Sequence, residues 1–343
     1  MNVPRRIADE TQLDELLSEP TDSVVEMFRR HPGDVVVLGA GGKMGPSLSR
    51  MARRAADAAG TKRRVIAVSR FSAGSEAWFQ TNGIETVRCD LLDESAVAQL
   101  PQAPNVVYMA GRKFGSTGQK SLTWAMNAYL PAAVCRRYRN SRIAAFSTGN
   151  VYPLTNPADG GSKETDAPQP VGEYAMSCLG RERMFEHFSN TFGTKVSLLR
   201  LNYACDLRYG VLVDLAMKVL AGELIDLRMG CFNTIWQGDA NAMALRSLEF
   251  ATSPPWVVNI TGPEMLSVRE VCLRLGELLN RPVRFTGVEG ETAFLSDARK
   301  GFEALGPPRV DADRLIRWVA DWIGGGGRSL NKPTHFEERE GRY

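Results

Sequence analysis

Short apolar runs separated by longer amphipathic stretches are the main pattern in the first 200 residues of this chain. The runs cover residues 35–38, 65–68, 106–109, 143–146 and 196–199. Continuous apolar runs of this length are typical of strands that are buried on both faces of a sheet. The stretches between them have helical length and periodicity. Strands that alternate with helices predict an α/β fold with a doubly wound parallel sheet.

The pattern changes at both ends of the chain. Residues 11–30 place apolar side chains among charges, which predicts helix interrupted at Pro20. After residue 201 the runs loosen, with strands expected at 234–236 and 257–260, a capped helix at 267–279 and a last helix at 309–323. We therefore expect an N-terminal helical extension (1–33), a sheet domain (34–202, also receiving about 234–262), a smaller C-terminal lobe (203–233 and 263–323) and a polar tail (324–343). The tail should be mobile or held only by its few hydrophobic residues.

The composition mainly excludes classes of protein. The chain has 343 residues, of which 43% are hydrophobic and 24% are charged, an ordinary globular composition. A net charge of +3 is too small to recruit nucleic acid or a membrane surface. Six cysteines without a CxxC pair argue against a metal site or a disulfide framework. With no signal peptide and no apolar run of about 18 residues, we expect a cytoplasmic protein that does not enter membranes.

A glycine-rich turn follows the first apolar run directly and opens a helix. Gly39, Gly42 and Gly45 have the spacing GxxGxxG, and Lys43 and Met44 lie between the last two. Glycines at these positions let backbone N–H groups and a helix N-terminus approach a pyrophosphate. Met44 stands where a kinase-type phosphate loop needs Ser or Thr, which argues against that loop. The turn predicts a Rossmann-type dinucleotide-binding domain, and the alternative is a purely structural turn.

The end of the second apolar run indicates which dinucleotide is preferred. An acidic residue there would bind the ribose 2′-hydroxyl of NAD, but this chain has Ser69 and Arg70. A small polar residue with an arginine suits a 2′-phosphate, so NADP is favoured over NAD. The alternative is that Arg70 merely begins a loop.

Residues after the third and fourth strands complete the predicted cofactor site. Asp90 and Leu91 follow a third strand, expected between the apolar runs 65–68 and 106–109, and a carboxylate there could hold the adenine amino group. The same acid could equally cap the next helix. Ala110 and Gly111 follow the fourth strand and are assigned to the cofactor as well.

Tyr174 lies 26 residues after Thr148, which ends the fifth strand, and here the chain resembles a known family. It is similar to the extended short-chain dehydrogenase/reductase family, the NAD(P)-dependent epimerases and dehydratases, over roughly residues 34–323. The motifs that carry the resemblance are the glycine loop, Asp90, residues 147–152, Tyr174 with Ser177, and residues 199–202, 237–239 and 305–306, followed by a terminal helix with Trp318 and Trp322.

The resemblance implies roles for individual residues. Thr148 would hydrogen-bond the reacting hydroxyl or carbonyl, and Tyr174 would be the acid/base, its proton exchange coupled to hydride transfer at the nicotinamide. Asn127 would have a structural or proton-relay role. Each residue could instead have a purely structural role: Thr148 could simply end a strand, Tyr174 could be a core aromatic, and Asn127 could be a polar helix residue.

Cys178 is the departure from the family, which has lysine four residues after the tyrosine. That lysine binds the nicotinamide ribose and lowers the tyrosine pKa electrostatically, and a thiol does neither well. Cys178 could be a redox or covalent residue, or a small hydrophobe that fills the space. Arg181 could reach back toward the ribose or pair with an acid, and Lys163 lies on the preceding loop. Without a cation, turnover should be slow near pH 7 and rise in alkali.

The residues expected on the substrate side do not identify a particular substrate. Arg208 and Arg228 could bind a diphosphate or lie on the surface, and Tyr203, Tyr209, Phe232 and Trp236 could line a pocket or form a core. The resemblance implies a homodimeric NAD(P)-dependent oxidoreductase, epimerase or dehydratase that acts on a sugar-like hydroxyl or carbonyl substrate such as a nucleotide sugar. The competing hypothesis is a dinucleotide-binding sensor or scaffold that has lost catalysis at Cys178.

Overall fold

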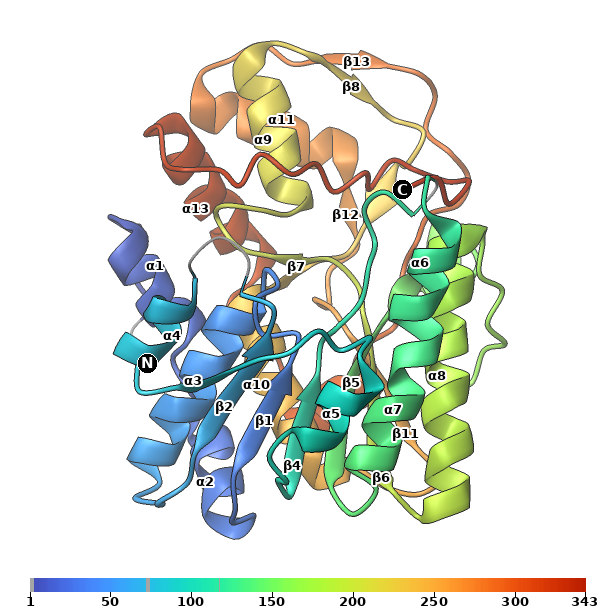
Figure 1. Ribbon diagram of the computed structural model, residues 1–343. Helices are drawn as coiled ribbons and strands as arrows, with labels where there is room; N and C mark the ends of the chain where they lie inside the picture. Colours follow the sequence, from blue (N-terminus) through green and yellow to red (C-terminus); the bar gives the residue numbers. More distant parts are fainter. Residues whose placement is uncertain (1–2, 72–74, 117) are drawn as a thin grey trace.

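A seven-stranded parallel sheet forms the centre of the molecule (Figure 1). The computed structural model describes residues 3–71, 75–116 and 118–343. The strand order is β11-β6-β5-β4-β1-β2-β3, and every neighbouring pair is parallel. The strands are β1 Val35–Leu38, β2 Val65–Ser69, β3 Glu85–Arg88, β4 Asn105–Tyr108, β5 Arg142–Thr148, β6 Lys195–Leu201 and β11 Trp256–Ile260.

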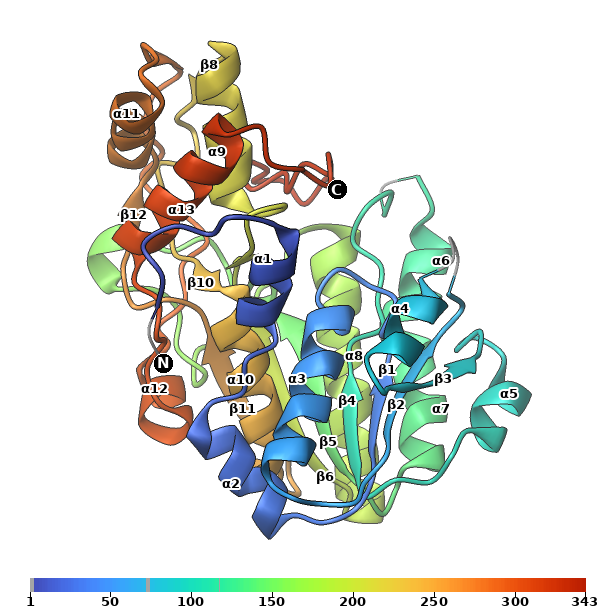
Figure 2. The same cartoon turned by 90° about the vertical axis from the view of Figure 1, so that its left-hand side faces the viewer.

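Helices cover both faces of this sheet (Figures 1 and 2). Alternate residues of a strand point to opposite faces, so Val35 and Val37 join one core while Val36 and Leu38 join the other. The first face carries α2 Asp22–Arg30, α3 Gly45–Ala58, α4 Glu76–Thr81, α10 Gln237–Arg246, η4 Ser247–Phe250 and α12 Arg299–Leu305. The second carries α5 Glu94–Gln99, α7 Leu130–Arg137 and α8 Gly172–Phe192, with α6 Lys120–Trp124 and the π-helical turn η1 Ala125–Tyr129 beside α8. The predicted doubly wound sheet is confirmed.

The strand order reverses beside β1, since the chain runs outward from β1 to β3 and then returns to β4 on the other side. In open parallel sheets such a reversal leaves a crevice at the carboxyl ends of the strands, where ligands bind. The residues that follow β1, β2, β4 and β5 therefore meet at one edge of the sheet.

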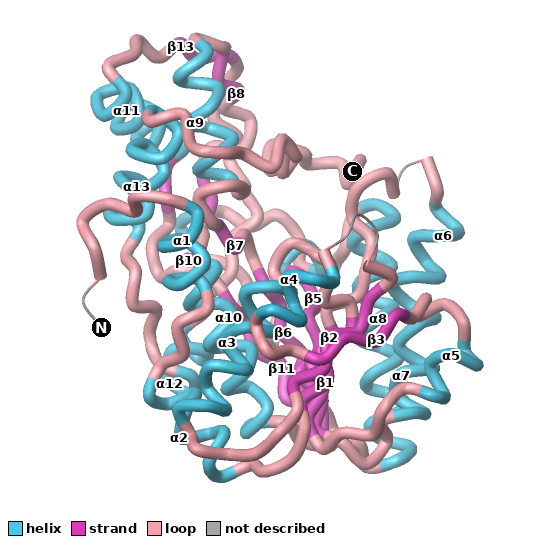
Figure 3. The backbone as a smooth tube through the Cα atoms, turned by 60° about the vertical axis from the view of Figure 1, so that its left-hand side comes forward, coloured by secondary structure: helices cyan, strands magenta, loops and turns pink. Residues whose placement is uncertain are grey.

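A smaller lobe lies above this edge (Figure 3). Its main helices are α9 Val211–Ala221, α11 Val268–Leu279 and α13 Ala312–Gly324, with short strand pairs β8 Leu224–Asp226 with β13 Arg284–Thr286, β9 Cys231–Phe232 with β12 Leu266–Ser267, and β7 Ala204–Cys205 with β10 Ile235–Trp236. These elements enclose a core of their own. Leu13 and Leu17 of α1 (Glu10–Leu17) are buried in that core, whereas α2 packs on the first face of the sheet. Pro20 lies between the two helices, as expected.

Two segments differ from the sequence expectation. Helix α12, which the sequence pattern assigns to the lobe, packs against β11 and buries Leu305 in a core of the sheet. The final segment, residues 325–343, is held by polar contacts as well as by its buried Phe336. Thr334 donates to Asp214 with its backbone N–H and its hydroxyl, and Arg339 donates to the Thr292 hydroxyl. The expectation of a mobile or loosely held tail is therefore wrong.

The described residues restrict the chemistry further. Across residues 3–71, 75–116 and 118–343, no helix has both the length and the apolar character that crossing a membrane requires. In the same part of the chain, no group of three or more His, Cys, Asp or Glu side chains could hold a metal ion. All six cysteines are free thiols.

Candidate active site

The glycine loop between β1 and α3 depends on close backbone approaches. Gly39 has φ +85°, and a Cβ atom there would lie 2.7 Å from the backbone nitrogen of Ala110. A Cβ atom at Gly45 would lie 2.1 Å from the carbonyl oxygen of Ala40. Helix α3 begins at Gly45 and has no side-chain cap, so its first N–H groups are available to a ligand. This geometry fits a pyrophosphate.

A cavity of about 230 Å³ beside this loop brings together most of the predicted cofactor residues. Eight of them line it: Gly39, Gly42, Ser69, Arg70, Asp90, Leu91, Ala110 and Gly111. They follow four different strands, and only the shared carboxyl edge of the sheet makes them neighbours.

The far end of this cavity has a mixed set of polar groups. Ser69 is half-buried at the end of β2, and Arg70 is exposed beside it. Asp90 accepts a hydrogen bond from the backbone of Leu92 (3.1 Å), while α5 is capped by Asp93. The alternative of Asp90 as the helix cap is therefore wrong, and its carboxylate lines the cavity.

A second cavity of about 250 Å³ runs from the glycine loop to Tyr174. Its walls include the remaining predicted loop residues, Lys43, Met44 and Gly45, and also Gly111, Lys113 and Arg181. The two cavities share Gly39, Gly42 and Gly111, so together they form an extended space that suits a dinucleotide.

Thr148 and Tyr174 meet at the end of this space. Thr148 is the last residue of β5, and Tyr174 lies in the first turn of α8. Their side chains line one cavity, and the Thr148 hydroxyl donates to Asn150 Oδ1 (3.0 Å). Removal from water raises the pKa of Tyr174 well above its ordinary value, and Cys178 adds to the effect while Arg181 opposes it. The pair has the geometry of an acid/base site, but its tyrosine strongly favours the neutral form.

Cys178 is fully buried against Val151, Tyr152 and Tyr174. Burial raises the pKa of its thiol, which remains neutral and packs against Tyr174. A neutral, enclosed thiol is poorly suited to redox or nucleophilic chemistry. Its packing is that of a small side chain that fills space.

Arg181, one turn further along α8, is a buried cation on the cofactor side. Its guanidinium donates to Asn127 Oδ1 (2.7 Å) and to the carbonyl oxygens of Phe146 (2.8 Å) and Asn127 (3.3 Å). The expectation that it pairs with an acid is wrong, because backbone and amide oxygens satisfy it instead.

Asn127 is buried in the π-helical turn η1 and fixes the loop after β4. Its Oδ1 accepts from the Arg112 backbone N–H (2.8 Å), and its Nδ2 donates to the Arg112 carbonyl (2.9 Å) and to Ser177 Oγ (2.9 Å). This side chain therefore ties the loop to the helix that carries Tyr174. It has the structural part of its predicted role.

Lys113, the next residue in that loop, was missed by the sequence analysis. Its Nζ donates to the Thr334 carbonyl (3.1 Å) and lies 4.4 Å from the ring centre of Tyr343 and 5.8 Å from that of Tyr174. Removal from water lowers the pKa of Lys113 to about 8. A lysine close behind the carboxyl end of a central strand was the available signal. The expected alternative, Lys163, is exposed and donates its backbone N–H to Asp166.

Tyr343 brings the final segment into the site, which no pattern had indicated. Its hydroxyl accepts from Asn150 Nδ2 (2.7 Å), and its ring stands edge-on to Tyr174 with the ring centres 5.4 Å apart. Two glycines with positive φ allow the approach: a Cβ atom at Gly172 would lie 2.4 Å from the carbonyl oxygen of Gly341, and a Cβ atom at Gly341 would lie 2.2 Å from that of Val171. The final segment is thus fitted to the start of α8.

A cavity of about 170 Å³ lies on the substrate side of the Thr148–Tyr174 pair. Its other polar walls include Lys113, Asn150, Asn202, Tyr203, Tyr209 and Thr334. Of the four aromatic residues considered above, Tyr203 and Tyr209 line this cavity. Phe232 and Trp236 instead belong to the core of the lobe.

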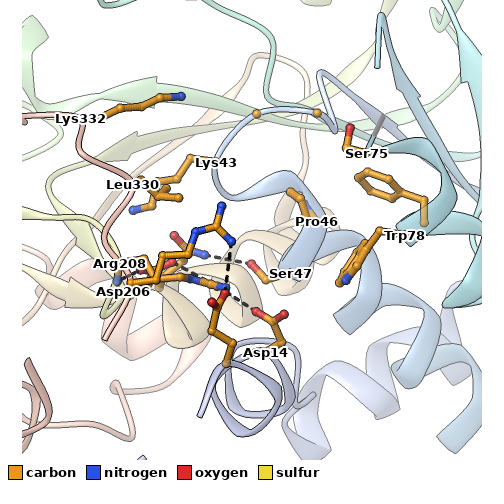
Figure 4. A pocket seen from close by; sticks show the side chains of 16 residues that line it. Asp14, Lys43, Pro46, Ser47, Ser75, Trp78, Asp206, Arg208, Leu330 and Lys332 are labelled. Atoms are coloured by element: carbon orange, nitrogen blue, oxygen red, sulfur yellow. Dashed lines mark hydrogen bonds and ion pairs between the residues drawn. The ribbon is translucent and has the colours of Figure 1, made fainter. Parts of the chain in front are cut away.

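A larger cavity of about 560 Å³ lies between the glycine loop, α1, α4 and the final segment (Figure 4). Arg208 crosses it to reach Asp14 (2.8 Å) and lies 3.6 Å from Asp206. The ammonium of Lys43 turns the other way, donating to the Ala204 carbonyl (2.9 Å). The guanidinium of Arg208 thus pairs with carboxylates. Arg228 is exposed and pairs with Asp226 (2.7 Å), so neither arginine is a free diphosphate ligand.

Comparison with known proteins finds a matching family and solved structures of similar fold. Residues 35–205 match the sequence model of the NAD dependent epimerase/dehydratase family. No curated protein sequence matches the chain. The structure is similar to dTDP-glucose 4,6-dehydratase from Streptomyces venezuelae with NAD and TYD bound (TM-score 0.70, 19% identity, 85% of this chain and 98% of that chain).

Two further solved structures are similar over comparable lengths. One is UDP-glucose 4-epimerase from Thermotoga maritima with UDP-glucose (TM-score 0.69, 17% identity, 85% of this chain and 99% of that chain). The other is UDP-glucose 4-epimerase from Thermus thermophilus in complex with NAD (TM-score 0.67, 20% identity, 84% of this chain and 98% of that chain). At these identities the likeness establishes a shared fold.

Proposed function

The chain belongs to the NAD-dependent epimerase/dehydratase family, and on that premise we propose that it oxidises and reduces a hydroxyl-bearing carbon of a nucleotide sugar. The observation that carries the proposal is the space that leads from the glycine loop to Tyr174, which lines a further cavity together with Thr148. A dinucleotide in this space would end beside the acid/base pair.

The residues present fit a dinucleotide. The uncapped start of α3 and the glycine loop would hold its pyrophosphate, and Asp90 its adenine. Ser69 and Arg70 would bind a 2′-phosphate, so we propose that NADP is preferred. When bound, the cofactor supplies a hydride acceptor and donor.

The remaining steps belong to side chains of the chain. Thr148 would hold the reacting oxygen, and Tyr174, in its ionised form, would take the proton from that oxygen when the carbon that bears it is oxidised. Asn127 holds the loop after β4 against α8 through its contacts with Arg112 and Ser177. Cys178 fills the space behind Tyr174 and keeps water out.

A nucleotide sugar is proposed as the substrate class for two reasons. The cavity beside Thr148 and Tyr174 is small and lined by amide, hydroxyl and phenol groups, which suit a sugar ring. Proteins of the same fold are complexed with UDP-glucose or are dTDP-glucose dehydratases. The epimerase and dehydratase outcomes remain alternatives within the proposal.

Cofactor titration is the first test. We expect Gly42→Leu to lower NADP affinity at least about tenfold, because a side chain there enters the cofactor cavities, while only the Gly39 carbonyl (3.3 Å) would lie close to its Cβ. Gly118→Leu is the control, since its Cβ would have open space. A folded Gly42→Leu protein with the parent's affinity would show that the site is misassigned.

A screen of nucleotide sugars, followed by nicotinamide absorbance and product analysis, is the second test. Tyr174→Phe should abolish turnover, and Tyr129→Phe, which alters an exposed tyrosine, should not. Parent-like turnover by Tyr174→Phe would refute the mechanism.

A dinucleotide sensor is the second candidate function. It is favoured by one observation, the edge-on packing of Tyr343 against the ring of Tyr174. Tight cofactor binding without turnover of any sugar in the screen would support this function instead.

Two further expectations belong to the proposal. Six free thiols agree with a cytoplasmic location. Exposed apolar side chains on α6, η1 and α8, namely Trp124, Tyr129 and Met176, agree with a homodimer formed through these helices. Sedimentation of the parent and of Met176→Glu tests the dimer.

A further inference from the structure

Building on the proposed function, we propose that Lys113 supplies the positive charge that Cys178 cannot provide at the reacting end of the cofactor. The residue comes from the loop after β4 rather than from α8. The charge would therefore reach Tyr174 from a different side than in the family pattern.

The first support is the fixed position of the loop. Asn127 binds both the N–H and the carbonyl of Arg112 (2.8 and 2.9 Å), so the backbone just before Lys113 is held at two points. The same asparagine binds Ser177, one residue before Cys178. The loop and the α8 turn that lacks the lysine are therefore positioned by one side chain.

The second support is the setting of the ammonium group. Lys113 Nζ donates to the Thr334 carbonyl and faces the rings of Tyr343 and Tyr174. Asp214 and Glu337 influence it as charges, but its hydrogen bond goes to a backbone carbonyl. The ammonium of Lys113 is therefore held by a backbone carbonyl rather than by a carboxylate. Its positive charge acts on the site in an environment of low effective dielectric constant.

The third support is the location of Lys113 where two cavities meet. It lines both the cavity that leads from the glycine loop and the cavity on the substrate side, and Tyr174 also lines both. Arg181 lines only the former, and its donors are taken up by Asn127 and Phe146. Lys43 lines both cavities too, but its ammonium donates to the Ala204 carbonyl and faces the ring of Tyr209, whereas the ammonium of Lys113 faces the rings of Tyr343 and Tyr174.

The pH dependence distinguishes these cations. Tyr174 is faced by Thr148 from β5, by Cys178 and Arg181 from α8, by Lys113 from the loop, and by Tyr343 from the final segment. With its pKa lowered to about 8, Lys113 is charged near pH 7 and neutral in alkali, whereas an arginine stays charged. Turnover should therefore fall above about pH 8, opposite to the rise expected for a site without a cation.

Cofactor binding tests the proposal without requiring turnover. Oxidised nicotinamide is positively charged and the reduced form is not, so a nearby ammonium selectively weakens binding of the oxidised form. We expect Lys113→Met to raise the affinity for NADP⁺ relative to NADPH about five- to tenfold near pH 7 and little near pH 9.5. Lys113→Arg should keep the parent's ratio and hold it at both pH values.

Lys163→Met is the matched control, because Lys163 is exposed, and its affinity ratio should equal that of the parent. An unchanged ratio in Lys113→Met, with both cofactors bound, would overturn the proposal for Lys113 while leaving the proposed function standing. Failure of the parent to bind any dinucleotide would instead overturn the proposed function. With an active substrate, Lys113→Met should also lose the fall in turnover above pH 8, and a retained fall would contradict the assignment.

Discussion

Lys113→Met should make the protein more stable near neutral pH, although it removes a residue that we assign to the active site. The pKa of Lys113 is about 8 in the folded protein and 10.5 in its ordinary state. The folded protein therefore binds this proton more weakly than the unfolded chain does. The resulting loss of stability is complete below pH 8 and disappears as the pH rises through 10.5.

The magnitude follows from the two values. A difference of 2.5 (10.5 minus 8) corresponds to at most about 3.5 kcal/mol near pH 7, at about 1.4 kcal/mol per unit of pKa. Lys113 keeps part of its surface in solvent, so screening reduces this to about 1–2 kcal/mol. Methionine preserves most of the side-chain volume and carries no proton. The gain in the free energy of unfolding should therefore be largest near pH 7 and shrink by about 1 kcal/mol or more near pH 9.5.

Urea unfolding of the parent, Lys113→Met and Lys163→Met at both pH values measures this difference. The control should show no pH-dependent gain, because Lys163 is exposed. The reasoning is refuted if Lys113→Met is destabilised near pH 7, or if its difference from the parent is the same at both pH values.

Three other variants test separate parts of the site. Arg70→Ala should lower NADP affinity about tenfold or more and change NAD affinity little, and equal losses measured by titration would exclude a 2′-phosphate role. Gly341→Val should release the final segment from α8, because its Cβ would lie 2.2 Å from the Val171 carbonyl, and limited proteolysis should then cleave that segment faster than in the parent. Cys178→Lys should destabilise the parent by about 2 kcal/mol or more, since it buries a cation beside Arg181, but it should cost less in the Lys113→Met background. Equal costs in the two backgrounds, measured by urea unfolding, would show that Lys113 and residue 178 do not share a site.

The sheet, and the convergence of the residues that we assign to the cofactor, were largely predictable from the sequence. Four-residue apolar runs between helical stretches are typical of strands that are covered on both faces, and the glycines of the first turn follow such a run directly. Once the strands are parallel, the residues after their carboxyl ends must converge, as Ser69, Asp90 and Gly111 do.

The substrate side was less predictable, for physical reasons. Lys113 lies in a loop, and its position depends on the side chain of Asn127, which is distant in sequence and binds the backbone of Arg112. Tyr343 reaches Tyr174 only because the lobe and α8 hold the final segment between them. Contacts between residues so distant in sequence leave no local period, so a polar stretch such as 325–343 looks unstructured.

Lys43 connects the glycine loop to the cavity that we assign to the substrate. It belongs to the glycine loop, yet its ammonium is bound by the Ala204 carbonyl (2.9 Å) and lies 4.2 Å from the ring centre of Tyr209, which lines the substrate cavity. A ligand that shifts the loop must also shift these residues. The affinity for either ligand is then changed by the other by the same factor, because such linkage is reciprocal at equilibrium.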